Sequence, residues 1–142
     1  MSRVFLGGTC NESTWREKII PLLEIDFYNP VVSDWTEECK QEELHQRSIC
    51  DYCLYVITPL MEGVYSIAEV VDDSNKRPEK TIFCFTITDY IPAINECGLI
   101  EKKFTDKQIN SLREVGKMVQ RNGGMFFETI EEAVNYLNKG GF

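Results

Sequence analysis

Short apolar runs alternate with amphipathic stretches along this chain, and that alternation limits the folds open to it. The apolar runs are continuous, as in YCLYVIT over residues 52–58 and TIFCFT over residues 81–86. A strand that is apolar on both faces belongs in a parallel sheet with helices packed on both sides. The pattern therefore predicts strands at residues 3–6, 25–28, 52–58, 81–86 and 125–127.

The segments between these runs have helical spacing and begin with residues that suit helix starts. Ser13 is the expected cap of a first helix, which Pro21 shortens or kinks. Further helices are expected from residue 36 to about 49, between Thr105 and Gly123, and over residues 129–137. Another begins near residue 64, after the third strand.

Strands separated by helices predict an α/β fold. Five strand–helix units in 142 residues fit one domain, residues 1–142, built on a flavodoxin-like, doubly wound, parallel five-stranded sheet in the order 2-1-3-4-5. Ligands of such sheets bind beyond the carboxyl ends of the strands, near the switch point between strands 1 and 3. The loops at that edge are residues 7–13, 29–35, 58–66 and 87–97.

The net charge and the hydropathy of the chain limit the classes of partner that we expect. Fifteen Lys and Arg residues against 23 Asp and Glu give a net charge of -8, which argues against nucleic acid because phosphate binding needs a basic surplus. No run approaches the roughly 18–20 apolar residues of a membrane helix, so no membrane is expected. The first apolar run reaches Gly7-Gly8 too soon for a signal peptide. We therefore expect a cytoplasmic protein.

The cysteines are expected to be free thiols in a reducing compartment. The Cys50-x-x-Cys53 spacing also suits zinc or thiol redox chemistry. However, there is no second CxxC, and His45 is the one histidine of the sequence. Because both cysteines flank an apolar strand, we favour core packing and expect no metal and no cofactor. The six cysteines are Cys10, Cys39, Cys50, Cys53, Cys84 and Cys97.

The first loop, residues 7–13, is rich in small and hydroxyl side chains. Backbone amides of Gly8 and Thr9 at a helix start can hold a phosphate or a sugar hydroxyl. A tight strand-to-helix turn explains the same composition, and the loop has neither a Walker nor a GxGxxG pattern. The residues alone leave both interpretations open.

Glu69 follows the third strand at a place where a carboxylate faces the cleft. It lies about one turn after Tyr65, on the same side of the expected helix. Such a Glu is able to attack an anomeric carbon. Spacing alone favours the simpler interpretation, an acid that suits the helix dipole. The expected core face is Val64, Ile67, Ala68 and Val71, with Asp72-Asp73 at the helix end and turn.

Other acidic residues gather at the same edge. Asp34 and Trp35 follow strand 2, and Glu62 precedes the helix of Glu69. Two nearby carboxylates can have their pKa values pushed apart, which leaves one as acid and one as nucleophile. Glu37-Glu38 and Glu42-Glu43 are expected on a solvated helix face.

Particular positions exclude one family with this fold and argue against a second. A receiver domain needs acidic residues after strand 1 and a phosphoacceptor Asp after strand 3, where this chain has Gly7-Gly8-Thr9 and Thr58-Pro59. A flavodoxin needs a denser Ser/Thr phosphate loop than Thr9, Ser13 and Thr14 supply.

Three segments together resemble the nucleoside 2-deoxyribosyltransferase superfamily, in its small deoxyribosyltransferase-like branch. They are VFLGGT (residues 4–9) with Trp15-Arg16, Asn29-Pro30 with Asp34-Trp35, and Gly63 with Ser66-Ile67-Ala68-Glu69. The resemblance covers about residues 3–86. It implies a flavodoxin-like fold and N-glycosidic chemistry on a (deoxy)nucleoside or nucleoside monophosphate.

The resemblance also implies roles for single residues. Glu69 matches the nucleophile, and Glu43 matches the acid that assists at the base. Phe5 stands where the family carries a Tyr that positions the nucleophile; a Phe cannot donate that hydrogen bond, and Tyr65 is the available substitute. The expected substrate-binding residues are Phe5, Gly8, Thr9, Asn29, Asp34, Trp35, Glu62, Gly63, Tyr65 and Ser66.

The leading hypothesis is therefore transfer or hydrolysis of an N-glycosidic bond through a glycosyl-enzyme. Two alternatives remain: a catalytically weak nucleotide-binding or sensing module, and a glycohydrolase of NAD-like dinucleotides, since TIR-type domains use a helix Glu on a similar fold. The expected partner is a small nucleoside or nucleotide. The resemblance also implies a homo-oligomer, to whose contact the exposed aromatics Phe104 and Phe142 would contribute.

Overall fold

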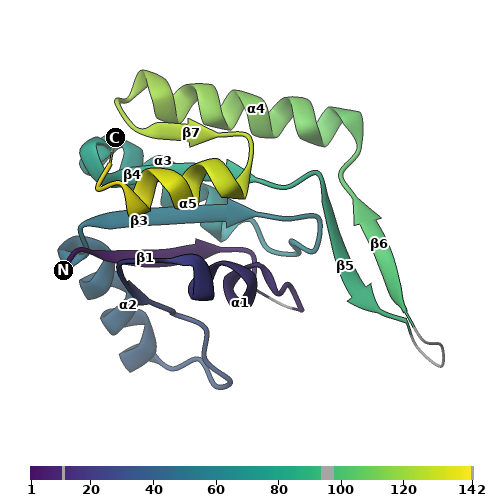
Figure 1. The fold of residues 1–142 in the computed structure, drawn as a ribbon, viewed down its shortest axis with the longest axis horizontal. Helices are drawn as coiled ribbons and strands as arrows, with labels where there is room; N and C mark the ends of the chain where they lie inside the picture. Colours follow the sequence, from purple (N-terminus) through teal and green to yellow (C-terminus); the bar gives the residue numbers. More distant parts are fainter. Residues whose placement is uncertain (11, 94–97, 142) are drawn as a thin grey trace.

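A five-stranded parallel sheet forms the centre of the protein in a computed structural model, which describes residues 1–10, 12–93 and 98–141. Neighbouring strands follow the order β2-β1-β3-β4-β7 (Figure 1). Counted among the parallel strands, this is 2-1-3-4-5, so the predicted flavodoxin-like α/β fold is confirmed. The strands are β1 (Arg3–Gly8), β2 (Asp26–Tyr28), β3 (Tyr52–Ile57), β4 (Thr81–Phe85) and β7 (Met125–Phe127).

Helices cover both faces of the sheet because side chains of successive strand residues point to opposite sides. In β3, Leu54 and Val56 pack beneath α1 and α5, whereas Tyr55 and Ile57 pack beneath α3 and α4. Strands buried on both faces explain why their sequences are continuously apolar. The helices are α1 (Trp15–Ile19), α2 (Glu37–Ile49), α3 (Tyr65–Lys76), α4 (Asp106–Arg121) and α5 (Ile130–Asn138), with 3-10 turns at Ile20–Leu22 and Pro78–Lys80.

Threonine caps begin three of the helices. Thr36 accepts a hydrogen bond from the Cys39 amide, and Thr129 accepts one from the Glu132 amide. Thr105 forms a full capping box with Gln108. The first helix differs from the prediction: Thr14 precedes it without a side-chain cap, and Ser13 Oγ instead donates to Asp89 Oδ2 at 2.6 Å. Pro21 stands in the 3-10 turn that ends this short helix, as predicted.

The predicted core face of α3 is wrong for Val64 and Ala68, whereas Ile67 and Val71 do pack against the core. Val64 is 67% exposed and Ala68 is also exposed, whereas the buried side chains are Glu69, Val70, Asp73 and Ser74. Ile67 and Val71 are only partly buried against the core. Asp72 and Asp73 lie inside the helix rather than at its end. The spacing of apolar residues did not predict the buried face because the carboxylates of Glu69 and Asp73 are buried with ionic partners.

The segment predicted as a loop after β4 contains a hairpin. Strands β5 (Thr88–Pro92) and β6 (Leu99–Lys103) pair antiparallel and project from the sheet as an arm (Figure 1). Phe104, expected to be exposed, is only 8% exposed and packs in the core. Cys50 and Cys53 are buried, as favoured. Cys97 and Phe142 lie outside the described residues.

The described ranges contain neither a membrane-spanning helix nor a metal-binding cluster. None of the helices there combines the length and apolar character needed to cross a bilayer. In the same part of the chain, no group of three or more His, Cys, Asp or Glu side chains is arranged to hold a metal ion.

Gly116 lets α4 approach the sheet closely, which gives a test of the packing. A Cβ at this position would lie 2.5 Å from the Phe126 ring, and that ring stacks on Phe83 and Phe85. Overpacking costs about 1–3 kcal/mol, and better helix propensity returns about 1 kcal/mol. Gly116→Ala should therefore lower the free energy of unfolding in urea by up to about 2 kcal/mol.

Gly63→Ala is the matched control because a Cβ at Gly63 meets no atom within 4 Å. Its free energy of unfolding should stay within about 0.5 kcal/mol of the wild type. Equal losses in the two variants would show that α4 does not press on Phe126.

Candidate functional site

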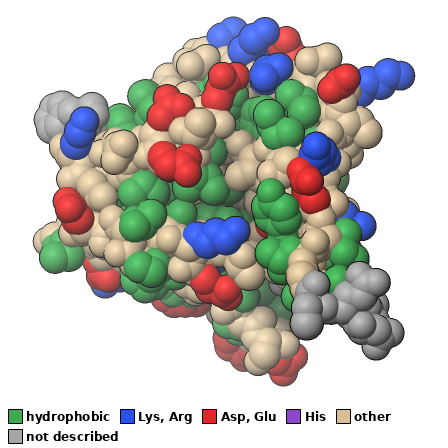
Figure 2. Space-filling view, turned by 45° about the vertical axis from the view of Figure 1, so that its right-hand side comes forward, with side chains coloured by type: hydrophobic (Ala, Val, Ile, Leu, Met, Phe, Trp, Pro, Cys, Tyr) green, Lys and Arg blue, Asp and Glu red, His purple; other side chains and the backbone are tan. Residues whose placement is uncertain are grey.

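A cleft of about 240 Å³ opens near the carboxyl ends of β1 and β3, at the predicted switch point. A smaller hollow of about 170 Å³ adjoins it and shares Gly8, Cys10, Tyr65 and Ser66 with it. Figure 2 shows the molecule with this edge turned forward, where hydrophobic side chains lie exposed among acidic ones. The main cleft is lined by Gly7, Gly8, Cys10, Arg16, Pro30, Val31, Val32, Trp35, Glu43, Tyr65, Ser66 and Glu69.

Two carboxylates from different helices meet in this cleft. Glu43 comes from α2 and Glu69 from α3, and Glu69 is only 7% exposed. Burial, followed by a hydrogen bond to Glu43 and the charge of Glu43, raises the pKa of Glu69 to about 8. The positive charge of Arg47 opposes this rise. The pair therefore holds a proton at neutral pH, as two carboxylates that share one site do.

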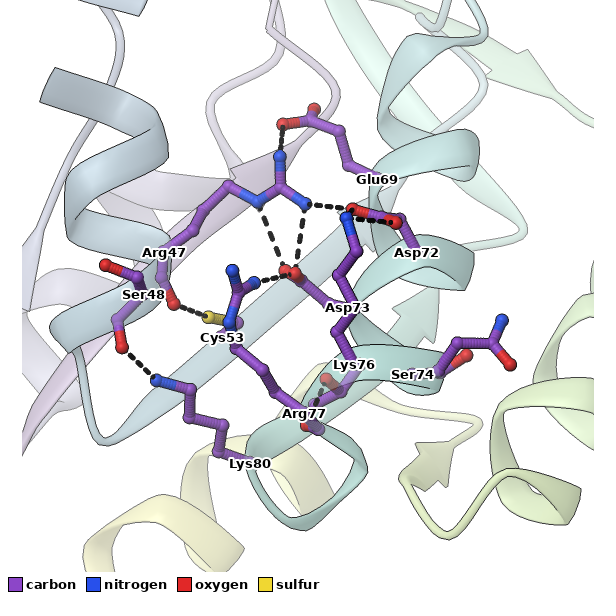
Figure 3. A network of polar contacts seen from close by, with 12 residues as sticks. Arg47, Ser48, Cys53, Glu69, Asp72, Asp73, Ser74, Lys76, Arg77 and Lys80 are labelled. Carbon is purple, nitrogen blue, oxygen red and sulfur yellow. Dashed lines mark hydrogen bonds and ion pairs between the residues drawn. The ribbon is translucent and has the colours of Figure 1, made fainter. Parts of the chain in front are cut away.

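The guanidinium of Arg47, which is not among the lining residues of the main cleft, contacts Glu69 (Figure 3). Its Nη1 donates to Glu69 Oε2 at 3.3 Å, and its Nη2 donates to Asp73 Oδ1 at 2.9 Å and to Asp72 Oδ2 at 3.3 Å. Its Nε donates to Asp73 Oδ2 at 3.2 Å. The side chain of Arg47 is 5% exposed. One buried cation thus joins three carboxylates of α3 to α2.

Asp73 is the most enclosed of these carboxylates, with a side chain that is 0% exposed. Besides Arg47, the Tyr55 hydroxyl donates to its Oδ2, and Arg77 donates to its Oδ1. Burial and then the negative charge of Asp73 raise the pKa of Tyr55. Tyr55 therefore stays protonated and able to donate.

The turn after β1 is built on a close approach of two backbones. Gly8 has φ 115°, and a Cβ there would lie 2.0 Å from the Val56 carbonyl oxygen. Only glycine fits such a position. Thr9 continues the contact, because its amide donates to Val56 O at 2.9 Å and its Oγ1 accepts from the Thr58 amide at 2.9 Å. The turn is therefore held rigidly against β3.

Arg16 ties this turn to α1. Its Nε donates to Leu6 O at 3.0 Å, Nη1 to Thr9 O at 2.7 Å and Nη2 to Gly8 O at 3.3 Å. The guanidinium lies 4.4 Å from the centroid of the Trp15 ring. Burial lowers the pKa of Arg16, although the guanidinium stays charged under all ordinary conditions. Much of its donor capacity is thus used on the loop itself.

Apolar side chains of the loop after β2 form another part of the cleft lining, called here the apolar wall. Val31, Val32 and Trp35 are 48%, 46% and 56% exposed, which is unusual for such side chains together. Asn29 shapes this loop, because its Oδ1 accepts from the Val31 amide at 3.1 Å. The lining of the cleft therefore combines ionic and apolar side chains.

The structure brings many of the predicted site residues together. Glu43, Glu69, Gly8, Trp35, Tyr65 and Ser66 line the main cleft. Thr9, Glu62 and Gly63 line the adjoining hollow. Tyr65 shares the cleft with Glu69 but is 65% exposed, and the hydrogen bond to Glu69 comes from Arg47.

Three predicted residues lie elsewhere. Phe5 is fully buried in the core, where it stacks on Tyr28 with ring centroids 6.0 Å apart. Asn29 acts on its own loop rather than in the cleft. Asp34 is exposed, and its carbonyl accepts a hydrogen bond from Cys39 Sγ at 3.8 Å. None of these three is among the lining residues of the cleft or the hollow.

Sequence reasoning missed Arg47, Asp73, Cys10 and the two valines of the apolar wall. Arg47 had a usable signal, since it follows Glu43 by four residues and so shares its side of α2. The fully buried Asp73 had none, because it stands beside the partly exposed Asp72 in an ordinary acidic pair.

Comparison with known proteins identifies the family. No curated protein and no solved structure matches the chain. A family model described as "Nucleoside 2-deoxyribosyltransferase like" matches residues 1–88. The match contains β1 to β4 together with the helices that carry Glu43 and Glu69. Because it covers more than half of the 142 residues, the chain belongs to the nucleoside 2-deoxyribosyltransferase-like family.

Proposed function

We propose that this protein breaks the N-glycosidic bond of a (deoxy)nucleoside or nucleoside monophosphate and passes the sugar to a second base or to water. The observation that carries the proposal is the Glu43–Glu69 pair in the cleft, with Glu69 held by Arg47 at 3.3 Å. Membership of the family supports the substrate class.

The pair supplies both functions that the reaction needs. A Glu69 carboxylate oxygen attacks C1′ while the bond from C1′ to the base nitrogen breaks. Glu43 gives its proton to the departing base, and the sugar remains as an ester on Glu69. A second base or a water then attacks C1′, returns its proton to Glu43 and frees Glu69. The negative charges of the cleft stabilise the oxocarbenium-like transition state.

The apolar wall suits the leaving base. Trp35 and the nearby valines, Val31 and Val32, present exposed apolar surface in the same cleft as Glu69. Any nucleobase can stack on an aromatic side chain, whichever substituents its ring carries, because every base has a π-face. The wall thus accounts for base binding without fixing base identity.

Turnover is the first test. Deoxynucleosides, their monophosphates and NAD are incubated with the protein, with and without a free acceptor base, and products are separated by chromatography. We expect free base from a nucleoside or its monophosphate. Exchange of bases would show transfer, and release alone would show hydrolysis. Glu69→Gln should lower kcat by about a thousandfold or more.

Glu38→Gln is the matched control, because Glu38 is exposed in the first turn of α2 and does not line the cleft. Its kcat should equal that of the wild type. Full activity in Glu69→Gln would eliminate the proposed nucleophile. Thermal stabilisation by a nucleotide without any turnover would favour the binding-module alternative instead.

The pH dependence follows from the shared proton. Glu69, whose pKa is raised to about 8, shares a proton with Glu43. In the proposed reactive form this proton lies toward Glu43 and Glu69 carries the charge, so that form disappears when the shared proton is lost near pH 8. We expect kcat/KM to fall above pH 8 and also in acid, where a second proton neutralises Glu69. In Glu43→Gln the alkaline limb should vanish and the plateau should drop about 10²–10⁴-fold. A rate that keeps rising above pH 8 would exclude Glu43 as the acid.

Trp35→Ala tests the apolar wall. Removing the ring takes away base stacking, which is worth about 1–3 kcal/mol per base, so KM should rise by about fivefold or more with a smaller change in kcat. Val64→Ala is the control, because Val64 is exposed at the N-cap of α3 and lines neither the cleft nor the adjoining hollow. Equal KM values for the Trp35 variant and the wild type would remove the wall from the binding site.

A further inference from the structure

Arg47 stands between the site and the core. It contacts Glu69 with one amino group, while its other donors contact Asp73 and Asp72 (Figure 3). A planar guanidinium whose donors are occupied on several sides cannot rotate without breaking charged hydrogen bonds. The position of Nη1, and with it the contact to Glu69, is therefore set by the other partners of the guanidinium, Asp73 and Asp72.

The partner that accepts two of the Arg47 hydrogen bonds is the fully buried Asp73. The hydroxyl of Tyr55, on β3, donates to Asp73 Oδ2, and Arg77, at the end of α3, donates to Oδ1. A buried carboxylate that accepts hydrogen bonds from this many donors is held in one position. Asp73 thus anchors Arg47 at the sheet rather than at the surface.

Other charges face Glu69 from each packed element. Glu43 faces it from α2, Arg16 from α1, and Asp73 from the next turn of α3. Glu43 and Asp73 oppose ionisation of Glu69, and the hydrogen bonds of Arg16 go to backbone carbonyls. Arg47 is the cation in this set for which the structure gives an ion pair with Glu69.

We infer that Arg47 is a positioning residue: Asp73 fixes its guanidinium, and the guanidinium holds Glu69 in the cleft as an oriented carboxylate. The inference rests on the proposed function only for the role of Glu69 as nucleophile. The arrangement of Arg47, Asp73 and Glu69 is a property of the fold, and it is testable without substrate.

Arg77 offers a matched comparison. It also bonds Asp73, but the structure gives it no contact with Glu69 within the described ranges. Arg47→Met and Arg77→Met both remove one cation from Asp73, so a purely structural role predicts similar effects. A positioning role predicts that only Arg47→Met changes Glu69.

The first measurement is the titration of Glu69 by NMR in protein labelled with ¹³C at Glu carboxyl carbons, assigned with Glu69→Gln. Loss of the nearby cation should lower the acid-dissociation constant of Glu69 about tenfold or more in Arg47→Met. Arg77→Met should leave it unchanged. Equal constants in the two variants, shifted or not, would overturn the inference even if no substrate is ever found.

The second measurement uses turnover. In Arg47→Met, kcat should fall about 100-fold with little change in KM, since a misplaced nucleophile loses transition-state contacts rather than substrate binding. The alkaline limb of the pH profile should move to higher pH. Arg77→Met should keep both values. An inactive wild type combined with a shifted Glu69 titration would refute the proposed reaction and leave the role of Arg47 supported.

Arg47→Lys covers the case in which Arg47→Met does not fold. Lysine keeps the positive charge but is a point donor that cannot hold Asp73 through two atoms and reach Glu69 as well. It should therefore restore folding and leave kcat at least about tenfold below the wild type. Wild-type kcat and an unchanged Glu69 titration in this variant would show that charge alone suffices and would overturn the positioning role.

Discussion

The charge of Asp73 has to be balanced inside the protein, and the way it is balanced joins the elements that carry the site. A buried carboxylate that loses its partner costs several kcal/mol. Arg47 brings α2 to this charge, Tyr55 brings β3, and Arg77 brings the end of α3. The helices α2 and α3 therefore cannot separate without exposing or stranding Asp73. Because Glu43 and Glu69 lie on these same helices, the facing pair is a consequence of that constraint.

The parallel sheet could be predicted from the sequence because burial on both faces leaves a direct record in continuous apolar runs. The runs at β3 and β4 end within a residue of the strands in the structure. The β5–β6 hairpin left no such record, since it projects from the body and carries Asp89, Pro92 and Lys102 among its apolar residues. The buried face of α3 was missed for a related reason. Sequence patterns place carboxylates outside, and only the partners in space show that Asp73 belongs inside.

Some residues of the candidate site could likewise be predicted from the sequence, and others could not. Glu69, Gly8 and Trp35 were predictable because topology puts strand ends and the loops after them at one edge of a parallel sheet. Phe5 and Asp34 came from the same rule and from the family resemblance, but the rule does not say which way a side chain points. Phe5 faces the core beside Tyr55, and Asp34 faces solvent. Orientation at a loop or a strand end depends on neighbours that are distant in sequence, as Arg47 and Asp73 are in contact although they are 26 positions apart.

The ionic and the apolar residues of the cleft lining are held by different kinds of contact, and the proposed reaction requires different precision from them. Glu69 is linked through Arg47 to the fully buried carboxylate of Asp73. In the apolar wall, Trp35 and the valines stand on an exposed loop shaped by a hydrogen bond from the Val31 amide to Asn29. Attack at C1′ requires a nucleophile placed to within a fraction of an ångström, whereas stacking of a base tolerates movement of the surface beneath it. A nucleophile held by buried charges, beside an exposed apolar surface, therefore suits the proposed cleavage at C1′, in which the base has to leave.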